Sequence, residues 1–595
     1  MKKIHSAGKF RWTCRLANQG RQVGRQVMVG GGVLLITFFN LLLYLPGHAG
    51  ATPTHMMVFW DPAFGSTPSG WTTLTTFNGD FPRGDTVANY GTTGGSGAPY
   101  TPTINTVTVG GPSATIPSPG TGSNSASDTH THPAPTVTVG SDSNGDIPAY
   151  RSLELMEYTT GIPTFLPGGA IVMFDTNGSI PSSGFTRISA QDNLMIQVNS
   201  SVTTGGSDTE TNSVSVGALS ARTDVVAQAK QQGNATQAAA TNHTHAAAAS
   251  GNTTATSTLP PYVQPQLAQA NADTSTIPAN TVVMFDGDPG TGWQVVSGTG
   301  GAYNQQFLRP AATASLTSQG ATTHTPPSYI ATSGADQTAG FNAKSNGSGS
   351  GSANATHTHQ ITVIFNSVSN LPPYFNVVIA QKITFSLQAY RWYVESGSQD
   401  VTDPWPSGSL DLAQNTMLPA IPAPYNPPDS VAGTQLRLRV QILVSGQALP
   451  ASNTQFKLQY KQDTDSTCTT GSWTDVATGN VWSYGANAVT DGTTLTTSRL
   501  TPTSSVMEIF SKSATSGTNP NAISTGQTAE YDWLIKDASA AGGSQYSFRV
   551  VESSGNPLST YSQCPTVVTA AQVNQDMRHG EFFQDGVDQG FEWAN

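Results

Sequence analysis

Charged residues are scarce in this sequence: Lys, Arg, Asp and Glu together make up 10% of its 595 residues. Gly, Ser, Thr, Asn and Pro are abundant instead, and the apolar residues come in short runs. This composition favours many short strands joined by turns over helices. We therefore expect a mainly β protein, and the length predicts several domains of roughly 100 to 200 residues each.

The local motifs of common enzyme classes are also missing. The sequence has no Gly-x-Ser-x-Gly elbow, no His-Glu-x-x-His, no phosphate-binding loop and no Gly-x-Gly-x-x-Gly between a strand and a helix. We therefore expect that the protein is not an enzyme. A catalytic triad or carboxylate pair assembled over long range, as in a glycan depolymerase, would leave no such local motif and stays as a lesser alternative.

Positive charge is concentrated at the N-terminus. The first 26 residues hold seven cations and no acid, and an apolar stretch from Val27 to Leu45 and the small residues Ala49-Gly50-Ala51 follow them. This layout predicts an export signal over residues 1–51 and a secreted protein of the bacterial cell surface. An uncleaved signal anchor is the alternative, and it would be the only contact with a membrane. The cations are Lys2, Lys3, Lys9, Arg11, Arg15, Arg21 and Arg25.

The rest of the chain is acidic. Without the seven N-terminal cations the formal net charge changes from −11 to −18. A phosphate backbone would be repelled by such a surface, so we expect no nucleic-acid partner.

Three cysteines occur, and one of them, Cys14, lies in the export signal. An exported chain with the remaining pair, Cys468 and Cys564, is expected to form one disulfide. Two unpaired thiols are the alternative.

Four sequence marks recur in one order and reveal three copies of one module. The first mark is an apolar segment ending in aspartate: Val58-Phe59-Trp60-Asp61, Val172-Met173-Phe174-Asp175 and Val283-Met284-Phe285-Asp286. About ten residues later a turn ends on an aromatic residue: Pro68-Ser69-Gly70-Trp71, Ser182-Ser183-Gly184-Phe185 and Gly290-Thr291-Gly292-Trp293. The first-mark segments, such as Ala170 to Asp175 and Thr281 to Asp286, are short and rich in Val and aromatics, as strands are.

The third mark is His-Thr-His and the fourth is a Pro-Tyr segment. The histidine pairs are His130 and His132, His243 and His245, and His357 and His359. The fourth mark reads Ile147-Pro148-Ala149-Tyr150, Leu259-Pro260-Pro261-Tyr262 and Leu371-Pro372-Pro373-Tyr374. These marks place the three repeats at residues 52–160, 161–275 and 276–384.

The histidine pairs are candidate metal ligands. Alternate residues of a strand share a face, so each His-Thr-His places two imidazoles on one side. Three pairs around an axis offer six nitrogens, which suits an octahedral divalent ion such as Fe, Zn or Ni. Surface histidines that bind nothing are the alternative. His324 has no histidine two residues away and is expected to be a solvated loop residue.

Two arrangements would bring the pairs together. The three repeats could surround a pseudo-threefold axis within one chain, which would then be a monomer. Alternatively, three chains could form a homotrimer with the repeats stacked along a fibre, and each level would hold its own six histidines.

The repeats resemble the phage tail-collar domain over residues 53 to about 384. The resemblance rests on the Val-Met-Phe-Asp segment, the turn that ends in Trp293, Phe307-Leu308-Arg309-Pro310, His-Thr-His and Leu-Pro-Pro-Tyr, and the third repeat matches best. It implies a β module of receptor-binding tail fibres, which form intertwined homotrimers with His-x-His pairs at a metal on the threefold axis.

Residues 385–570 change to regular strand alternation. Leu436, Leu438, Val440, Ile442 and Val444 alternate with polar or charged residues, which predicts one buried and one wet face. Further segments at Phe456 to Tyr460, Glu530 to Ile535 and Tyr546 to Val551 favour a β-sandwich. Their order resembles a fibronectin type III domain. Trp392, Trp473, Trp482 and Trp533 are expected in its core, and residues 571–595 form a C-terminal tail.

These features predict an adhesion or receptor-recognition protein that presents loops of a rigid, metal-stapled β head to a cell-surface glycan or protein. The sandwich would then be a spacer or anchor, since fold alone does not assign a ligand. A purely structural component of an envelope or filament is the alternative.

Overall fold

The computed structural model describes residues 55–569 except 61–66, 113–131, 142–146, 160–165, 176–179, 182, 221–243, 275–276, 279, 291, 335–357, 406–411, 422–433, 463–464 and 504. The described chain consists of strands and one 3-10 helix, η2 (Val87–Asn89), which confirms the mainly β class. In this part of the chain no helix has the length and apolarity that a membrane span requires. The predicted export signal and the C-terminal tail lie outside the described residues.

The apolar segments of the first mark form three central strands, β1 (Met56–Trp60), β8 (Ala170–Phe174) and β18 (Thr281–Phe285). Every residue in them is buried, which explains why they are continuous apolar runs instead of alternating ones.

The three central strands pair with one another in a closed cycle. The start of β1 lies antiparallel to the end of β18, the start of β18 to the end of β8, and the start of β8 to the end of β1. The facing residues include Met56 with Phe285, Thr281 with Phe174, and Ala170 with Trp60. The central strands of the three repeats therefore close a cycle within one chain.

Each repeat also supplies its own outer strands. The strands that follow the fourth mark pair antiparallel with the central strand of the same repeat, and the strands of the second mark pair with them in turn. The first set is β7 (Tyr150–Tyr158), β16 (Tyr262–Gln264) with β17 (Gln266–Ala270), and β26 (Tyr374–Lys382). The second set is β2 (Trp71–Thr73), β9 (Phe185–Arg187) and β19 (Trp293–Val295).

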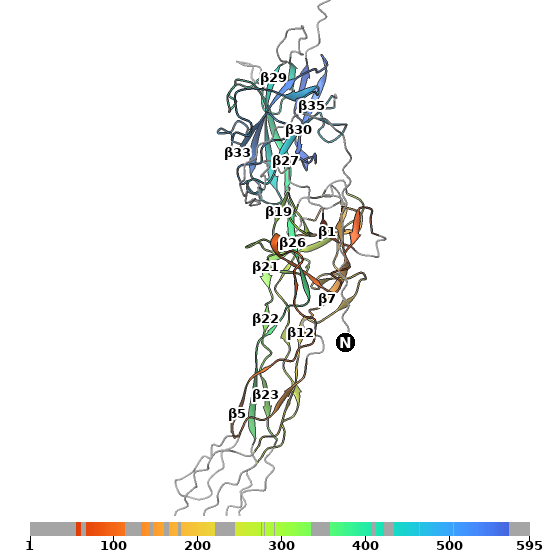
Figure 1. Ribbon diagram of the computed structural model, residues 1–595, viewed down its shortest axis with the longest axis vertical. Helices are drawn as coiled ribbons and strands as arrows, with labels where there is room; N and C mark the ends of the chain where they lie inside the picture. Colours follow the sequence, from red (N-terminus) through yellow and green to blue (C-terminus); the bar gives the residue numbers. More distant parts are fainter. Residues whose placement is uncertain are drawn as a thin grey trace, which may run out of the picture. The chain divides into compact units, whose positions relative to one another are not determined.

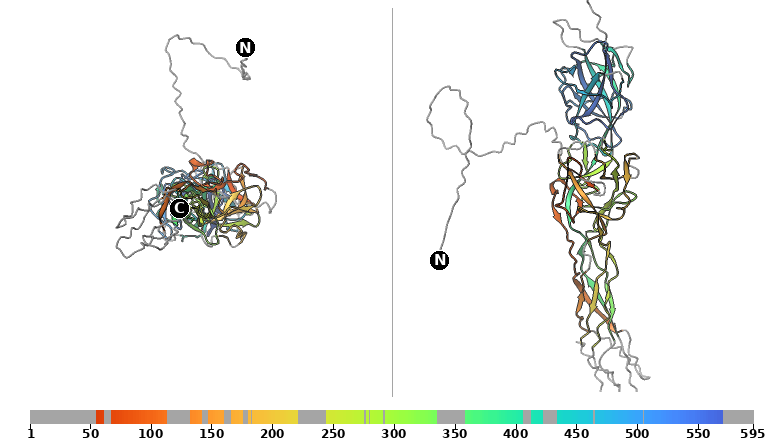
Figure 2. Two further views of the ribbon diagram at one scale, coloured as in Figure 1. Left: turned by 90° about the horizontal axis from the view of Figure 1, so that it is seen from below. Right: turned by 90° about the vertical axis from the view of Figure 1, so that its right-hand side faces the viewer.

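Other strands cross from one repeat to the next. One strand of each repeat lies parallel to an outer strand of its neighbour, and a second lies antiparallel to the same strand. The crossing strands are β3 (Phe81–Gly84) and β4 (Thr93–Gly94) on β26, β10 (Met195–Val198) and β11 (Thr204–Gly205) on β7, and β20 (Phe307–Leu308) and β21 (Ser315–Gln319) on β16. Figures 1 and 2 show the resulting interweaving of red, yellow and green segments.

A glycine marks each of these crossings. Gly95, Gly206 and Gly320 all have positive φ angles, of 74°, 70° and 73°. A Cβ on Gly95 would lie 1.9 Å from the carbonyl oxygen of Pro372, in the fourth mark of the third repeat. The other two glycines meet Pro148 and Pro260 at 2.0 and 2.1 Å in the same cyclic order, so only glycine fits.

Beyond the crossings, short sheets again combine strands of different repeats. One contains β5, β24 and β23, and another contains β6, β13 and β14. Buried residues of both sheets, including Val214 and Ile361, share one core. The strands are β5 (Ile104–Pro112), β6 (Val137–Val139), β12 (Thr209–Glu210), β13 (Ser213–Val216), β14 (Gly251–Asn252), β15 (Thr256–Ser257), β22 (Thr323–His324), β23 (Tyr329–Thr332), β24 (His359–Phe365) and β25 (Val368–Ser369).

The C-terminal region is a β-sandwich of two sheets around one apolar core (Figure 1). The six-stranded sheet contains β27 (Thr384–Val394), β29 (Gln435–Ser445), β32 (Trp482–Tyr484), β33 (Val506–Ser511), β34 (Thr528–Asp537) and β36 (Thr560–Tyr561). The five-stranded sheet contains β28 (Leu418–Ile421), β30 (Phe456–Gln462), β31 (Thr474–Asp475), β35 (Gln545–Glu552) and β37 (Thr566–Thr569).

Three of the four predicted core tryptophans are buried in the sandwich. Trp392, Trp482 and Trp533 have no exposed surface. The prediction for Trp473 was wrong: its ring is partly exposed and stacks against cations, with the Arg549 guanidinium 4.4 Å from the ring centre. Cys468 and Cys564 form the predicted disulfide, with their Cα atoms 5.4 Å apart.

Candidate metal centre

One histidine from each repeat reaches a common buried position. His359 is the first residue of β24, His245 forms an isolated bridge with Leu219, and His132 precedes β6. Their exposed fractions are 0%, 0% and 6%. The three rings stand edge to face, with centres 4.7 to 4.9 Å apart.

The hydrogen bonds of these rings follow the same cycle as the strands. His132 Nδ1 lies 2.8 Å from the Ser220 carbonyl oxygen of the second repeat, and His245 Nδ1 lies 3.0 Å from the Gly334 oxygen of the third. His359 Nδ1 lies 2.8 Å from the Gly110 oxygen of the first. A carbonyl oxygen can only accept, so each Nδ1 carries the proton and donates it. In a neutral ring, Nε2 then holds the lone pair that a metal needs.

The three rings offer ligand atoms that all lie within 4.8 Å of one another. Metal–imidazole bonds of about 2.0–2.1 Å would bring such nitrogens to roughly 2.9–3.4 Å apart in octahedral or tetrahedral geometry. Small movements of the rings would therefore close the triangle around one ion.

Burial also favours the neutral, ligating form of His359. Removal from water lowers the pKa of His359, the hydrogen bond to Gly110 partly opposes this, and the positive charges of protonated His132 and His245 would lower it further. A neutral His359 can share one cation with the other two rings.

The other three predicted ligands, His130, His243 and His357, lie outside the described residues. The structure thus brings together one member of each predicted pair, and the six-nitrogen octahedron stays a prediction.

The prediction that His324 is a solvated loop residue was wrong. His324 is 9% exposed and lies against Glu210 of the second repeat, with its Nε2 2.5 Å from a Glu210 carboxylate oxygen. Its Nδ1 contacts the Asn370 amide oxygen, and Tyr100 of the first repeat donates its hydroxyl to Glu210. The partners come from distant parts of the sequence, so no local pattern indicates the burial.

A second cluster was missed by the sequence reasoning. His55 Nδ1 contacts a Glu157 carboxylate oxygen and lies 3.2 Å from Asp286 Oδ2, and the ligand atoms of all three lie within 4.8 Å of one another. Burial and the neighbouring Glu157 raise the pKa of Asp286 to about 6, although His55 opposes them. Asp286 is the last residue of a first-mark segment, and this position is the one sequence feature that could have indicated the cluster.

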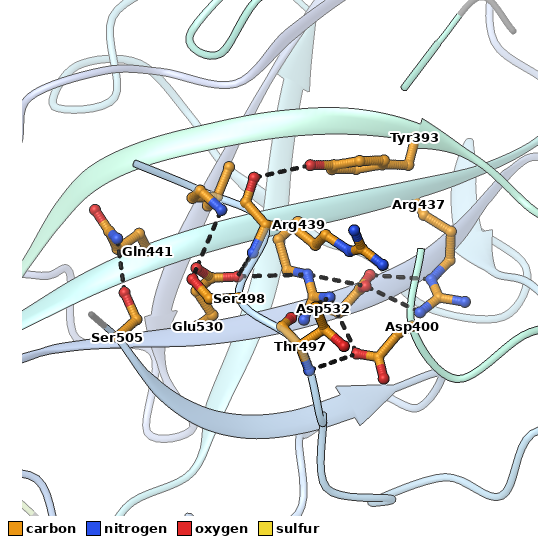
Figure 3. A network of polar contacts seen from close by, with 12 residues as sticks. Tyr393, Asp400, Arg437, Arg439, Gln441, Thr497, Ser498, Ser505, Glu530 and Asp532 are labelled. Atoms are coloured by element: carbon orange, nitrogen blue, oxygen red, sulfur yellow. Dashed lines mark hydrogen bonds and ion pairs between the residues drawn. The ribbon is translucent and has the colours of Figure 1, made fainter. Parts of the chain in front are cut away.

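A buried ionic network in the sandwich was also unexpected (Figure 3). Arg437 and Arg439, on the face of β29 predicted to be wet, are fully buried. Asp532 accepts two hydrogen bonds from Arg437, at 3.0 and 2.9 Å, and lies 3.4 Å from Arg439 Nε. The predicted wet face was wrong because residues 395–400 and 497–500 cover it, through Glu395, Ser398, Gln399, Asp400, Thr497, Ser498, Arg499 and Leu500.

Comparisons with protein-family models, with curated proteins and with solved structures found no match to this chain.

Proposed function

We propose that this chain is a secreted recognition protein of the bacterial cell surface, with a head of three tail-collar-type repeats. A divalent ion bound by His132, His245 and His359 would hold the three repeats together. The cyclic convergence of these imidazoles carries the proposal. Each Nδ1 is held by a carbonyl of the next repeat, and a hydrogen bond of this kind orients the other ring nitrogen, Nε2, toward a metal. Fe, Zn or Ni suits such a nitrogen-rich set.

A metal here would tie the repeats together outside the sheet that contains the central strands. The sheets around the histidines are short, such as β6 with three residues and β14 with two. Such strands contribute little stability alone. One ion bound by all three repeats would add its binding free energy to the folded state, because the unfolded chain lacks the site.

The contacts of Tyr100, Glu210 and His324 support a monomer with internal pseudo-threefold symmetry over a homotrimer of stacked repeats. In a stacked homotrimer each level would gather three copies of the same residue, and three Glu210 carboxylates would repel one another. In the single-chain arrangement a carboxylate meets an imidazole and a hydroxyl, which are complementary.

Recognition follows from the resemblance to tail-collar domains and from the export-type N-terminus. We propose a cell-surface glycan or protein as the partner, no nucleic acid, and no catalytic activity. The sandwich, of fibronectin type III type, would serve as a spacer or anchor.

The test combines light-scattering molar mass with metal analysis of the purified protein, before and after a strong chelator. We expect a monomer in both states, with bound Fe, Zn or Ni lost on chelation together with heat stability. The variant His245→Asn keeps an amide donor for the Gly334 carbonyl but removes the ring nitrogen that would bind metal. It should remain folded and lose the ion. A trimer, or a chain without metal in any state, would contradict the proposal.

Binding is tested separately, with the metal-loaded protein on arrays of cell-surface glycans and on intact cells. Saturable binding supports recognition. Self-assembly without any ligand would favour the structural alternative, and cleavage of a polysaccharide would overturn both.

A further inference from the structure

We infer that His55, Glu157 and Asp286 form a second divalent-cation site, independent of the histidine centre, where the first and third repeats meet. The ligand set is one imidazole and two carboxylates, and the site is open to water. This inference does not depend on the proposed function.

The backbone brings the three side chains together. His55 directly precedes β1, Asp286 directly follows β18, and the two strands pair antiparallel with Met56 opposite Phe285. Strand β1 also pairs with β7, and there Glu157 of β7 faces Met57 of β1. His55 is held with a φ of 93°, a conformation that is unusual for a residue with a side chain.

The two carboxylates have too little positive charge around them. Within the described part of the chain, His55 is the one ion-pair partner of Glu157 and Asp286. A protonated His55 would therefore leave one negative charge uncompensated. Asp286 and Glu157 have side-chain exposures of 25% and 14%, so water screens this charge only in part.

At the equivalent position, between the second and third repeats, a different kind of group faces the aspartate. Glu157 faces Met57 of β1, and in the third repeat Gln381 faces Val282 of β18 in the same way. Asp175 directly follows β8 as Asp286 directly follows β18, and Gln381 donates its amide to Asp175 at 3.0 Å. A neutral amide donor therefore satisfies the aspartate there. At the corresponding place Glu157 presents a second acceptor, so either a shared proton or a bound cation must lie between the two acids.

The chemistry of the ligands selects the kind of ion. Two carboxylates and an imidazole, with further positions for water, suit Mn²⁺ or a similar divalent ion better than the nitrogen-only histidine centre does. The side-chain exposure of His55, 39%, leaves a route for the ion from solvent.

The test uses the full chain carrying His245→Asn, so that the histidine centre cannot contribute. Mn²⁺ is titrated after chelator treatment, and binding is followed by loss of the electron paramagnetic resonance signal of free Mn²⁺. We expect one Mn²⁺ per chain. Adding Glu157→Gln, which recreates the Gln381–Asp175 contact, should weaken binding at least about 100-fold, because losing a direct ligand costs more than losing a residue that only hydrogen-bonds to a ligand.

Two further results complete the test. In the second repeat the position equivalent to His55 is Gly169, which has a φ of 102°. The variant His55→Gly therefore suits the backbone here. It should also weaken Mn²⁺ binding while the thermal unfolding midpoint is retained. Equal Mn²⁺ affinity in the parent and in both variants would overturn the inference. No Mn²⁺ binding by the parent would also overturn it, because His55 and shared protons would then compensate the carboxylate charges without a metal.

Discussion

The repeats and the sandwich bury their charged groups in different ways. In the repeats, the buried charged residue Glu210 meets His324, and the two come from different repeats. In the sandwich, Arg437, Arg439 and Asp532 belong to one domain and hold its own loops. The Glu210–His324 contact therefore depends on how the copies assemble, whereas the ionic network of the sandwich depends only on the domain's own fold.

In the sandwich network, the hydrogen-bonding capacity of the Arg437 guanidinium is fully used. All five N–H donors of this guanidinium have acceptors: two on Asp532, one on Glu395, and the carbonyls of Ser398 and Gln399. A buried ion pair adds little over an apolar pair of the same size, but breaking one side of it is costly. The network is thus a place where one substitution should have a large effect.

Replacement of the shared acid should produce the largest loss. Asp532→Ala leaves two buried guanidinium groups without their common partner, and we expect it to lower the free energy of unfolding by about 3–5 kcal/mol. Urea unfolding followed by the fluorescence of the buried tryptophans would measure this. The control is Asp475→Asn, which breaks the ion pair with Lys457 where the Asp475 side chain is 46% exposed. That change should cost about 0–1 kcal/mol, and equal losses would contradict the role of burial.

A second acid of the sandwich should make stability depend on pH. Burial raises the pKa of Glu508 to about 8, and hydrogen bonds with Asn521 oppose only part of this. Unlike Asp532, Glu508 has no ion-pair partner among the described residues. The unfolded carboxyl loses its proton near pH 4.5, whereas the folded one keeps it until about pH 8. The contribution of Glu508 to stability should therefore be fully present below pH 4.5 and be lost as the pH rises toward 8.

The variant Glu508→Gln cannot ionise, so it should lack this pH dependence. Relative to the parent, it should gain more than about 1 kcal/mol between pH 5 and pH 8. Urea midpoints at pH 5, 6.5 and 8.5 would show the difference. Parallel curves for the two proteins would mean that Glu508 is already ionised when folded.

The strands of the repeats could be predicted from the sequence because their signal is local. Ala170 to Asp175 and Thr281 to Asp286 were expected as strands, and the structure has Ala170–Phe174 and Thr281–Phe285. Partner choice could not be predicted in this way. The start of β1 pairs with β18 of the third repeat, and its apolar residues would suit the central strand of another copy equally well.

The candidate sites were predictable to the extent that they repeat. His132, His245 and His359 were found because the same motif occurs three times. His55, Glu157 and His324 have no such copies, and the His55–Glu157 and His324–Glu210 contacts each join residues more than 100 positions apart. Arg437 was assigned to a wet face because strand alternation cannot show that a distant loop will cover it.

The smallest predicted effect, the coupling free energy between Glu210 and His324, tests most directly how the repeats are assembled. Glu210→Gln and His324→Gln each remove one partner of a buried contact, and the double variant removes both. If the two residues meet, as they do here, the three unfolding free energies should not add, and the coupling should be about 1 kcal/mol. If the repeats instead stacked in a homotrimer, Glu210 would face Glu210 and His324 would face His324. The two substitutions would then add within about 0.3–0.5 kcal/mol, and Glu210→Gln alone would stabilise the protein by removing a like-charge contact.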